Sequence, residues 1–376
     1  MVIPARARAV EAIRPTRALV DLEALATNLR AVRAAAPTSE VFGVIKADAY
    51  GHGAVQVARR LAREGVDGLC VALPEEGIEL RQAGLLLPVL ILGGTYADGA
   101  AETLAFGLTP VVHDLEQIAR LHEVARGRQV KVHLKVDTGM SRLGVAIGDL
   151  PRVLWRARRY PSVVIDGVMS HLAAADVGEE ATLDQLDRFG DALRLVSEAG
   201  LRPAKIHMAN SAGVFRFPTT HFDLVRPGLA LYGVSPAPGC GLSLEPVMTV
   251  LTAIVHMRTL EPGDRVSYGG TFVARRPTRL GVLPVGYADG LSPRMSNLGS
   301  VLVRGHRAPV VGAVCMDMCM IDVTDIDGAG VGDEVVLLGR QGDEEVTATE
   351  LAGIHGSVPH EVLTSVSRRV PRFYVR

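Results

Sequence analysis

Lysine is scarce in this chain. Lysine and arginine together account for 40 of the 376 residues, yet only four of them are lysines, so arginine is the default cation. A buried lysine loses its charge readily, and its free amine can then act as a base or a nucleophile. Each lysine is therefore worth inspecting. The four are Lys46, Lys131, Lys135 and Lys205.

Other features are also missing. The net charge is −1 and no basic stripe occurs, which argues against nucleic acid or an anionic membrane as the main partner. The longest apolar run, residues 85–92, is too short to span a bilayer, and residues 1–15 lack the apolar stretch of a secretory signal. The cysteines show neither a disulfide framework nor the spacing of metal ligands. We expect a cytoplasmic protein with reduced thiols. The cysteines are Cys70, Cys240, Cys315 and Cys319.

What is present is a repeated alternation of strand and helix patterns. Eight short, apolar runs lie between residues 41 and 225, and amphipathic stretches separate most of them. This alternation over roughly 200 residues predicts an α/β fold, a (β/α)8 barrel. A doubly wound open sheet is disfavoured because no Gly-x-Gly-x-x-Gly follows the first run. The predicted strands are residues 41–45, 68–72, 89–92, 109–112, 130–136, 163–170, 205–208 and 222–225.

The pattern changes at about residue 245. Short β-rich segments then follow one another between turn signals, which predicts a second, mostly β domain. We therefore expect a lead-in over residues 1–15, a barrel over residues 16–244 and a β-rich domain over residues 245–376.

Polar residues follow the ends of five predicted barrel strands. Active sites of such barrels are built at the carboxyl ends of the strands. One polar residue at one strand end would mean little, but five such strands predict a candidate active site. The residues are Lys46 after the first strand, Lys135 and Asp137 at the fifth, His171 after the sixth, Asn210 and Ser211 after the seventh, and Arg226 after the eighth.

Lys46 lies where a buried strand opens into a loop, which suits the chemistry of a Schiff-base lysine. The seventh and eighth strand ends of a barrel often hold a phosphate through backbone N–H groups and small hydroxyls. Ser211 can supply a hydroxyl there, and Gly228 allows close approach of the backbone. A phosphate grip opposite a lysine suggests pyridoxal 5'-phosphate, bound as an imine to Lys46. No metal is expected.

Arg226 indicates the type of reaction. Many pyridoxal enzymes place an acid against the pyridine nitrogen, which keeps the ring protonated and makes it a strong electron sink. A guanidinium only donates hydrogen bonds and would leave that nitrogen unprotonated. The weaker sink favours rapid return of a proton to the α-carbon. This suits racemisation and disfavours transamination.

Racemisation needs an acid or base on each face of the α-carbon. Lys46 can serve one face once substrate has displaced it. Tyr268, on a turn between two β-rich segments, is a candidate for the other face, and a chain through His171 and Arg226 could lower its pKa. As an isolated feature, Tyr268 is more typical of a packing aromatic than of a catalytic residue.

Lys135 and Arg142 pose an electrostatic problem, because two cations side by side repel each other. Either a carboxylate such as Asp137 mediates between them, or a covalent modification removes the charge of the lysine.

Nine short motifs, in order from about residue 16 to the end, resemble those of the alanine racemases, pyridoxal phosphate enzymes with a barrel and a C-terminal β domain. The ordered set is far more specific than any single motif. The barrel motifs are residues 44–53 (VIKADAYGHG), 135–144 (KVDTGMSRLG), 170–172 (SHL), 207–212 (HMANSA) and 225–228 (VRPG). Those of the second domain are residues 266–269 (VSYG), 286–290 (GYADG), 315–317 (CMD) and 369–372 (RVPR).

The resemblance implies an isomerase that interconverts L- and D-alanine by a two-base mechanism and supplies D-alanine for peptidoglycan. Lys46 would hold the cofactor and act toward the D-enantiomer. Tyr268 would act toward the L-enantiomer in the barrel of a partner subunit, so that a homodimer shares its active sites. His171 would link Arg226, facing the ring nitrogen, to Tyr268.

The resemblance also implies the remaining contacts. Arg142 would bind the substrate carboxylate and the ring oxygen, and Met316 of the partner subunit would complete the carboxylate site. Lys135 would be carbamylated, giving an anion that can orient Arg142. Tyr50, Ser211, Gly228 and Leu229 would grip the phosphate, and Asn210, Tyr232 and His360 would also contact the cofactor.

The sequence departs from the family at His360, where relatives typically carry a tyrosine that contacts the phosphate and lines the substrate entrance. Its different size and its ionisation near neutral pH raise the alternative of a racemase of broader specificity, for example one acting on serine. A barrel-type pyridoxal phosphate decarboxylase is disfavoured by Arg226. A non-catalytic pyridoxal phosphate carrier is disfavoured because single-barrel carriers lack a β domain.

Overall fold

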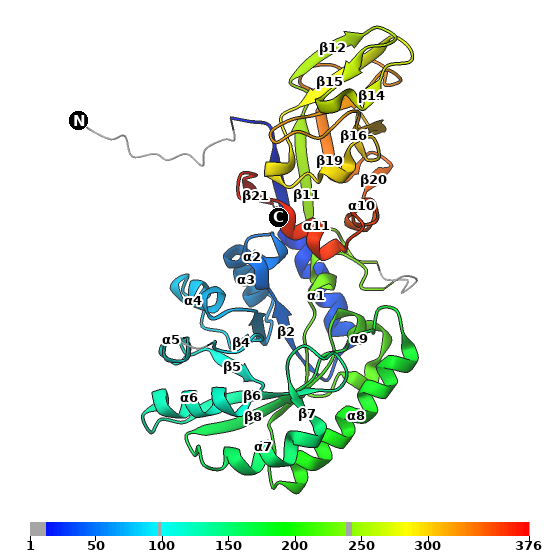
Figure 1. Cartoon of the computed structure of the whole chain (residues 1–376). Helices are drawn as coiled ribbons and strands as arrows, with labels where there is room; N and C mark the ends of the chain where they lie inside the picture. Colours follow the sequence, from blue (N-terminus) through cyan, green and yellow to red (C-terminus); the bar gives the residue numbers. More distant parts are fainter. Residues whose placement is uncertain (1–12, 97–98, 238–242, 376) are drawn as a thin grey trace, which may run out of the picture. The chain divides into compact units, whose positions relative to one another are not determined.

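The computed structural model describes residues 13–96, 99–237 and 243–375 (Figure 1). They form two compact units. One unit is Glu23–Glu245, and the other combines the residues up to Leu22 with those from Pro246 onward. Within the described ranges, no helix is both long enough and apolar enough to cross a membrane. Cys240 lies outside the described residues, and the other three cysteines are free thiols.

The unit Glu23–Glu245 is a barrel of parallel strands. Hydrogen-bonded neighbours follow the order β10-β2-β3-β4-β5-β6-β8-β9, and a short extra strand, β7 (Val145–Ala146), pairs with β6. The two ends of this order, β10 and β9, are also connected. The Asp223 N–H donates to Ile206 O at 3.0 Å, and the Arg226 N–H donates to Ala209 O at 3.0 Å. The predicted (β/α)8 fold is confirmed. The strands are β2 (Glu40–Val44), β3 (Gly68–Val71), β4 (Val89–Ile91), β5 (Thr109–Val112), β6 (Val130–Asp137), β8 (Val163–Met169), β9 (Lys205–His207) and β10 (Leu224–Val225).

Helices connect these strands. The link between the seventh and eighth strands, which had the weakest helical pattern, contains the short helix α9 (Ser211–Arg216). The other helices of the unit are α1 (Leu22–Ala35), α2 (Lys46–Tyr50), α3 (Ala54–Arg63), α4 (Pro74–Gln82), α5 (Ala100–Ala105), α6 (Leu115–Ala125), α7 (Leu150–Ala157) and α8 (Glu179–Glu198).

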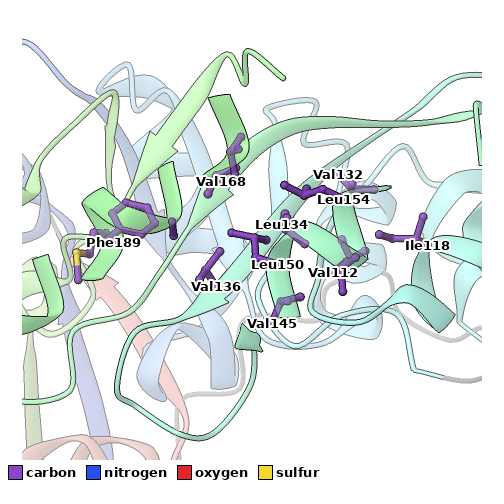
Figure 2. Close-up of a cluster of buried hydrophobic side chains, with 14 of the residues drawn as sticks. Val112, Ile118, Val132, Leu134, Val136, Val145, Leu150, Leu154, Val168 and Phe189 are labelled. Atoms are coloured by element: carbon purple, nitrogen blue, oxygen red, sulfur yellow. The ribbon is translucent and has the colours of Figure 1, made fainter. Parts of the chain in front are cut away.

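Strand β6 shows how the sequence separates core from site. Val132, Leu134 and Val136 belong to the buried cluster drawn in Figure 2, together with apolar residues of neighbouring strands and helices. Successive side chains of a strand point to opposite faces. His133 and Lys135 therefore point away from this apolar layer, toward the inside of the barrel.

The second unit is mostly β, as expected. Its largest sheet has the order β17-β16-β19-β11-β1-β21, with β20 paired to β19, and two smaller sheets are β12-β15-β18 and β13-β14. The strands are β1 (Arg17–Asp21), β11 (Met248–Ala253), β12 (His256–Leu260), β13 (Arg265–Val266), β14 (Phe272–Val273), β15 (Thr278–Leu283), β16 (Ser300–Val303), β17 (His306–Pro309), β18 (Cys319–Asp322), β19 (Glu334–Gln341), β20 (Glu344–Val346) and β21 (Arg372–Val375). Two helices, α10 (Ala348–His355) and α11 (Pro359–Ser365), lie between β20 and β21.

Strand β1 differs from the sequence expectation, which placed its residues at the start of the barrel segment. It pairs antiparallel with β11 and parallel with β21, both from the C-terminal part of the chain. Ala18 and Val20 are buried in alternation with more exposed neighbours. Such alternation predicts a half-buried strand but carries no information about its partner strands.

Candidate active site

Lys46 follows β2 directly, at the carboxyl edge of the barrel. The preceding Ile45 N–H donates to Cys70 O at 2.9 Å, so the sheet continues up to the lysine. The side chain is half-buried. Burial lowers the pKa of Lys46, and the charge of Arg142 lowers it further. Lys46 is therefore more readily deprotonated than an ordinary lysine, as a base or nucleophile requires.

The short element α2 (Lys46–Tyr50) is a left-handed turn and not an ordinary α-helix. Ala47, Asp48, Ala49 and Tyr50 all have positive φ, between 52° and 54°. Each such residue costs about 1–2 kcal/mol relative to the right-handed form, so the turn needs support from its surroundings. Two carboxylates provide it. Asp48 Oδ1 accepts from the Ala54 N–H at 2.7 Å, and Glu76 Oε1 accepts from the Ala47 N–H at 2.6 Å.

The left-handed turn brings Tyr50 against Gly228. A Cβ placed on Gly228 would lie 2.5 Å from the Tyr50 hydroxyl oxygen, so only glycine fits there. The Ser211 Oγ accepts from the N–H groups of Gly228 at 2.9 Å and of Ala230 at 3.2 Å. Leu229, between these two, is buried. Hydroxyls and backbone N–H groups from three separate segments therefore converge around the missing side chain.

Two further predicted residues support this region. Tyr232 is fully buried; its hydroxyl donates to Val44 O at 2.9 Å, and its ring centroid lies 4.8 Å from that of Tyr50. Asn210 Oδ1 accepts from the Gly213 N–H at 3.0 Å and so begins α9. In the structure Tyr232 packs against Tyr50, and Asn210 caps the helix that begins with Ser211.

Arg226 is 3% exposed and holds its guanidinium inside the barrel. Nη2 donates to Ser170 O at 2.8 Å and to Met208 O at 3.1 Å, and Nη1 lies 2.5 Å from His207 Nδ1. Among the described residues, no carboxylate forms an ion pair with it. Burial lowers the pKa of Arg226 to about 10, so it remains a cation at neutral pH.

His171 lies beside Arg226, with its Nδ1 3.5 Å from Nη2. Its pKa is held well below the ordinary value, first by burial and then by the charge of Arg226. His171 is therefore a neutral imidazole at neutral pH, able to accept at one nitrogen and donate at the other.

Lys135 is 5% exposed, and no hydrogen bond from its amine occurs in the described structure. Burial is the main cause that lowers its pKa to about 8, followed by the charges of Arg142 and Arg226. Asp137 opposes this shift, but its Oδ1 accepts from the backbone N–H groups of Gly139 and Ser141. The structure thus brings together the cations predicted from the sequence, and the site has an excess of positive charge that suits an anionic ligand.

Tyr268, Met316 and His360 belong to the other unit. Tyr268 is 78% exposed and Met316 is half-exposed, and both line a surface hollow of about 720 Å³. Ser267, just before the tyrosine, has a φ of 65° and donates its hydroxyl to Ala313 O at 2.7 Å. His360 lies near the start of α11, outside that hollow.

Several residues of the site were not predicted from the sequence. His207 was noticed only as part of a motif, and His133, Asp48 and Glu76 received no role. Period-two alternation along β6 could have identified His133, because it shares a face with Lys135. The two carboxylates carry no such pattern, since their partners are backbone groups of a turn whose handedness the sequence did not reveal.

Comparisons with known proteins identify the family of the chain. The family model for the N-terminal domain of alanine racemase matches residues 20–236, and that for the C-terminal domain matches residues 247–374. An alanine racemase of Sorangium cellulosum is 50% identical, with 96% of this chain and 99% of the relative covered.

Solved structures give the same result. The alanine racemase of the D-cycloserine producer Streptomyces lavendulae superposes with a TM-score of 0.93 at 37% identity, covering 97% of this chain and 98% of that one. The alanine racemase of Bartonella henselae, solved with covalently bound pyridoxal phosphate, gives a TM-score of 0.89 at 31% identity, covering 96% and 99%. The resemblance inferred from the sequence motifs is confirmed: this chain belongs to the alanine racemase family.

Proposed function

We propose that the chain interconverts L- and D-alanine with pyridoxal 5'-phosphate as cofactor, and that its D-alanine is used for peptidoglycan. The observation that carries this proposal is the buried guanidinium of Arg226, which has no carboxylate partner among the described residues and lies in the same barrel as the low-pKa amine of Lys46. A pyridine nitrogen of the cofactor that faces a group able only to donate hydrogen bonds stays unprotonated. This favours return of a proton to the α-carbon of the substrate over transamination.

The residues fit the cofactor. Tyr50, Ser211 and the backbone at Gly228 form a cradle that a Cβ would fill. The Ser211 oxygen accepts from two N–H groups, so its own hydrogen can be donated to a phosphate. The excess of cations suits a ligand that carries a phosphate, joined by a substrate that carries a carboxylate. When bound, pyridoxal phosphate supplies a conjugated system that delocalises the negative charge developing at the α-carbon.

Two proton carriers follow from the proposal. Lys46, with its lowered pKa, takes or returns the proton on the D-face of the substrate α-carbon. Tyr268 serves the L-face from the partner subunit, and His171, a neutral imidazole, connects its hydroxyl to Arg226. The high exposure of Tyr268 within its own unit supports a role in an interface. We therefore propose a homodimer with two shared active sites.

Substrate binding and lysine modification belong to the same proposal. Arg142 binds the substrate carboxylate, and Met316 of the partner subunit completes that site. Lys135, with a pKa of about 8, is partly neutral at physiological pH, and only a neutral amine can add carbon dioxide. The amine adds carbon dioxide and releases a proton to water. The resulting carbamate is an anion, so it attracts Arg142 where the ammonium would repel it, and it orients the guanidinium.

The proposed domain organisation is a barrel within residues 16–244 followed by a β-rich domain over residues 245–376, after a lead-in of 15 residues. The strand β1 is the exception, because it pairs with β11 and β21 of the β-rich domain. Arg14, in the lead-in, forms an ion pair with the buried Asp289 at 2.7 Å, so the end of this segment is part of the folded structure. The free thiols of Cys70, Cys315 and Cys319 support a cytoplasmic location.

A second candidate function is a racemase of broader specificity, for example one acting on serine. It is favoured by His360, a residue smaller than the tyrosine typical of the family. The barrel-type decarboxylase and the non-catalytic carrier remain less favoured, the first because of Arg226 and the second because the chain contains the β unit that bears Tyr268.

The experiment is a racemisation assay on the purified protein with pyridoxal phosphate, starting separately from L-alanine and D-alanine. Chiral chromatography should show both enantiomers approaching equal amounts. Lys46→Ala should abolish this and should also remove the absorbance band of the lysine-bound cofactor. A panel of other amino acids, with carbon dioxide release measured in parallel, separates the alternatives. Absence of alanine racemisation by a cofactor-loaded protein would contradict the proposal.

A further inference from the structure

Two histidines extend inward from Arg226 through the barrel. Arg226 Nη1 lies 2.5 Å from His207 Nδ1, and His207 Nε2 lies 2.7 Å from His133 Nδ1. His207 is fully buried and His133 is 5% exposed. This series of hydrogen bonds therefore runs from the guanidinium at the site through the fully buried His207 to the largely buried His133.

The chemistry of the donor fixes the direction of every hydrogen bond in this series. A guanidinium has no acceptor, so His207 Nδ1 must accept from Arg226. A neutral His207 then carries its hydrogen on Nε2 and donates it to His133 Nδ1, which must accept. Burial supports the neutral form of both rings, since it lowers the pKa of His133 to about 4 and that of His207 well below its ordinary value.

The backbone makes room for the second ring. His133 lies on β6 opposite Gly167 of β8, at an irregularity in the register between Val132 and His133. A Cβ on Gly167 would lie 2.6 Å from the ring of His133. An ordinary side chain at position 167 would displace the ring, so the glycine and the irregular register together allow His133 to reach His207.

His133 also reaches the far end of the barrel. It lines a hollow of about 430 Å³ among residues near the amino ends of the strands. The charged groups that line this hollow with it are Glu40, Asp67, Lys131, Asp166 and Lys205, of which Glu40 pairs with Lys205 and Lys131 with Asp166. The Nδ1 of His133 is the only acceptor available to His207 Nε2 in the described hydrogen bonds.

We propose that His133 is a positioning residue for the reaction: by accepting from His207 Nε2, it keeps Nδ1 of His207 free of hydrogen and so holds the guanidinium of Arg226. The functional part of this statement rests on the proposed racemisation. Without the acceptor at position 133, His207 can move its hydrogen to Nδ1. That N–H would face an N–H of Arg226, and the guanidinium would have to shift.

The first test measures the hydrogen positions directly. Nitrogen NMR of the holoenzyme, labelled with ¹⁵N-histidine and assigned with single-histidine variants, should show His207 with hydrogen on Nε2 only. His133→Leu should give a mixture that includes the Nδ1–H form. His133→Gln, whose side-chain oxygen can still accept, should keep the parent form. His207 carrying hydrogen on Nδ1 in the parent protein would overturn the proposal, even if no variant folds.

The second test separates positioning from general damage to the fold. His133→Leu should lower kcat for alanine about tenfold with little change in KM, because a shift of the guanidinium affects the chemical step. His133→Gln should recover most of the loss. The matched control is His221→Leu, which removes another buried histidine. The Nε2 of His221 bonds to Val214 O at 2.8 Å, and this bond is not part of the series from Arg226 to His133. His221→Leu should retain the parent kcat.

The two tests can fail independently. A parent protein with the expected tautomers but no racemase activity would contradict the proposed function and would still support the hydrogen-bond directions. An unchanged His207 signal together with an unchanged kcat in folded His133→Leu would overturn the positioning role of His133.

Discussion

Replacing Gly228 with alanine is expected to weaken cofactor binding while leaving the barrel folded. The new methyl carbon would lie 2.5 Å from the hydroxyl oxygen and 3.2 Å from the ring carbon Cζ of Tyr50. Real carbon and oxygen atoms do not approach so closely, so the tyrosine must move away from the phosphate cradle. Overpacking of this kind costs about 1–3 kcal/mol. If that cost is felt in the bound state, the dissociation constant rises by about 5- to 150-fold.

The assay is a titration of the cofactor-free protein with pyridoxal phosphate, followed by absorbance. A second variant, Tyr50→Phe, loses the hydroxyl and should also bind more weakly. The double variant tests the contact itself, because the phenylalanine removes the atom that the new methyl strikes. Its loss should be smaller than the sum of the two single losses.

Gly190→Ala is the matched control. Gly190 lies inside α8, and a Cβ there would meet nothing within 4 Å. Alanine should leave cofactor affinity unchanged and, because glycine is a poor helix former, should stabilise the fold by up to about 1 kcal/mol. The reasoning about the cradle would be refuted by Gly228→Ala binding pyridoxal phosphate as tightly as the parent.

Three other predictions follow from the site. Tyr268→Phe should lower kcat from L-alanine by roughly 10²- to 10⁴-fold, the range for loss of a general acid or base, while Tyr160→Phe retains the parent rate; an active Tyr268→Phe variant would contradict the two-base assignment. Asp48→Ala removes the acceptor of the Ala54 N–H and should lower the free energy of unfolding in urea by about 1 kcal/mol; an equal loss in the exposed control Asp187→Ala would argue against this cause. Because the pKa of Lys135 is about 8 when folded and near 10.5 otherwise, the unfolded chain binds more protons between these values, so stability should rise with pH across that window. Urea titrations in carbon dioxide-free buffer should show this rise in the parent and a smaller one in Lys135→Met; equal slopes would contradict the shifted pKa of Lys135.

The barrel could be predicted because each strand is an apolar run bounded by turn signals, and the sheet buries both of its faces. Lys46, His171 and Arg226 were found for a related reason: each is the first polar residue after such a run. The rule concerns position along a strand, and the closed sheet then brings these positions together. Position alone therefore predicted that Lys46, His171 and Arg226 lie at the carboxyl edge of the barrel.

Other features depend on tertiary partners that no local pattern encodes. The alternation in β1 is typical of a strand but does not indicate its pairing with β11 and β21, which lie more than 220 positions further along the chain. The left-handed turn after Lys46 contains alanine and tyrosine, residues that seldom adopt positive φ, so the sequence argues against the conformation observed. The hydrogen bonds that Asp48 and Glu76 accept from backbone N–H groups explain how this turn is held.

The costly features of the barrel are concentrated inside it and at one edge. The turn at residues 47–50, the repulsion between Lys135 and Arg142, and the buried charge of Arg226 all destabilise the fold. The apolar layer around Val132, Leu134 and Val136 on the other face of the same strand contributes the opposing free energy (Figure 2). Strand β6 thus combines a destabilising residue, Lys135, with stabilising apolar neighbours on its other face. Relieving the charge at Lys135 should therefore stabilise the protein, and if the proposed carbamate orients Arg142, the same change should lower activity.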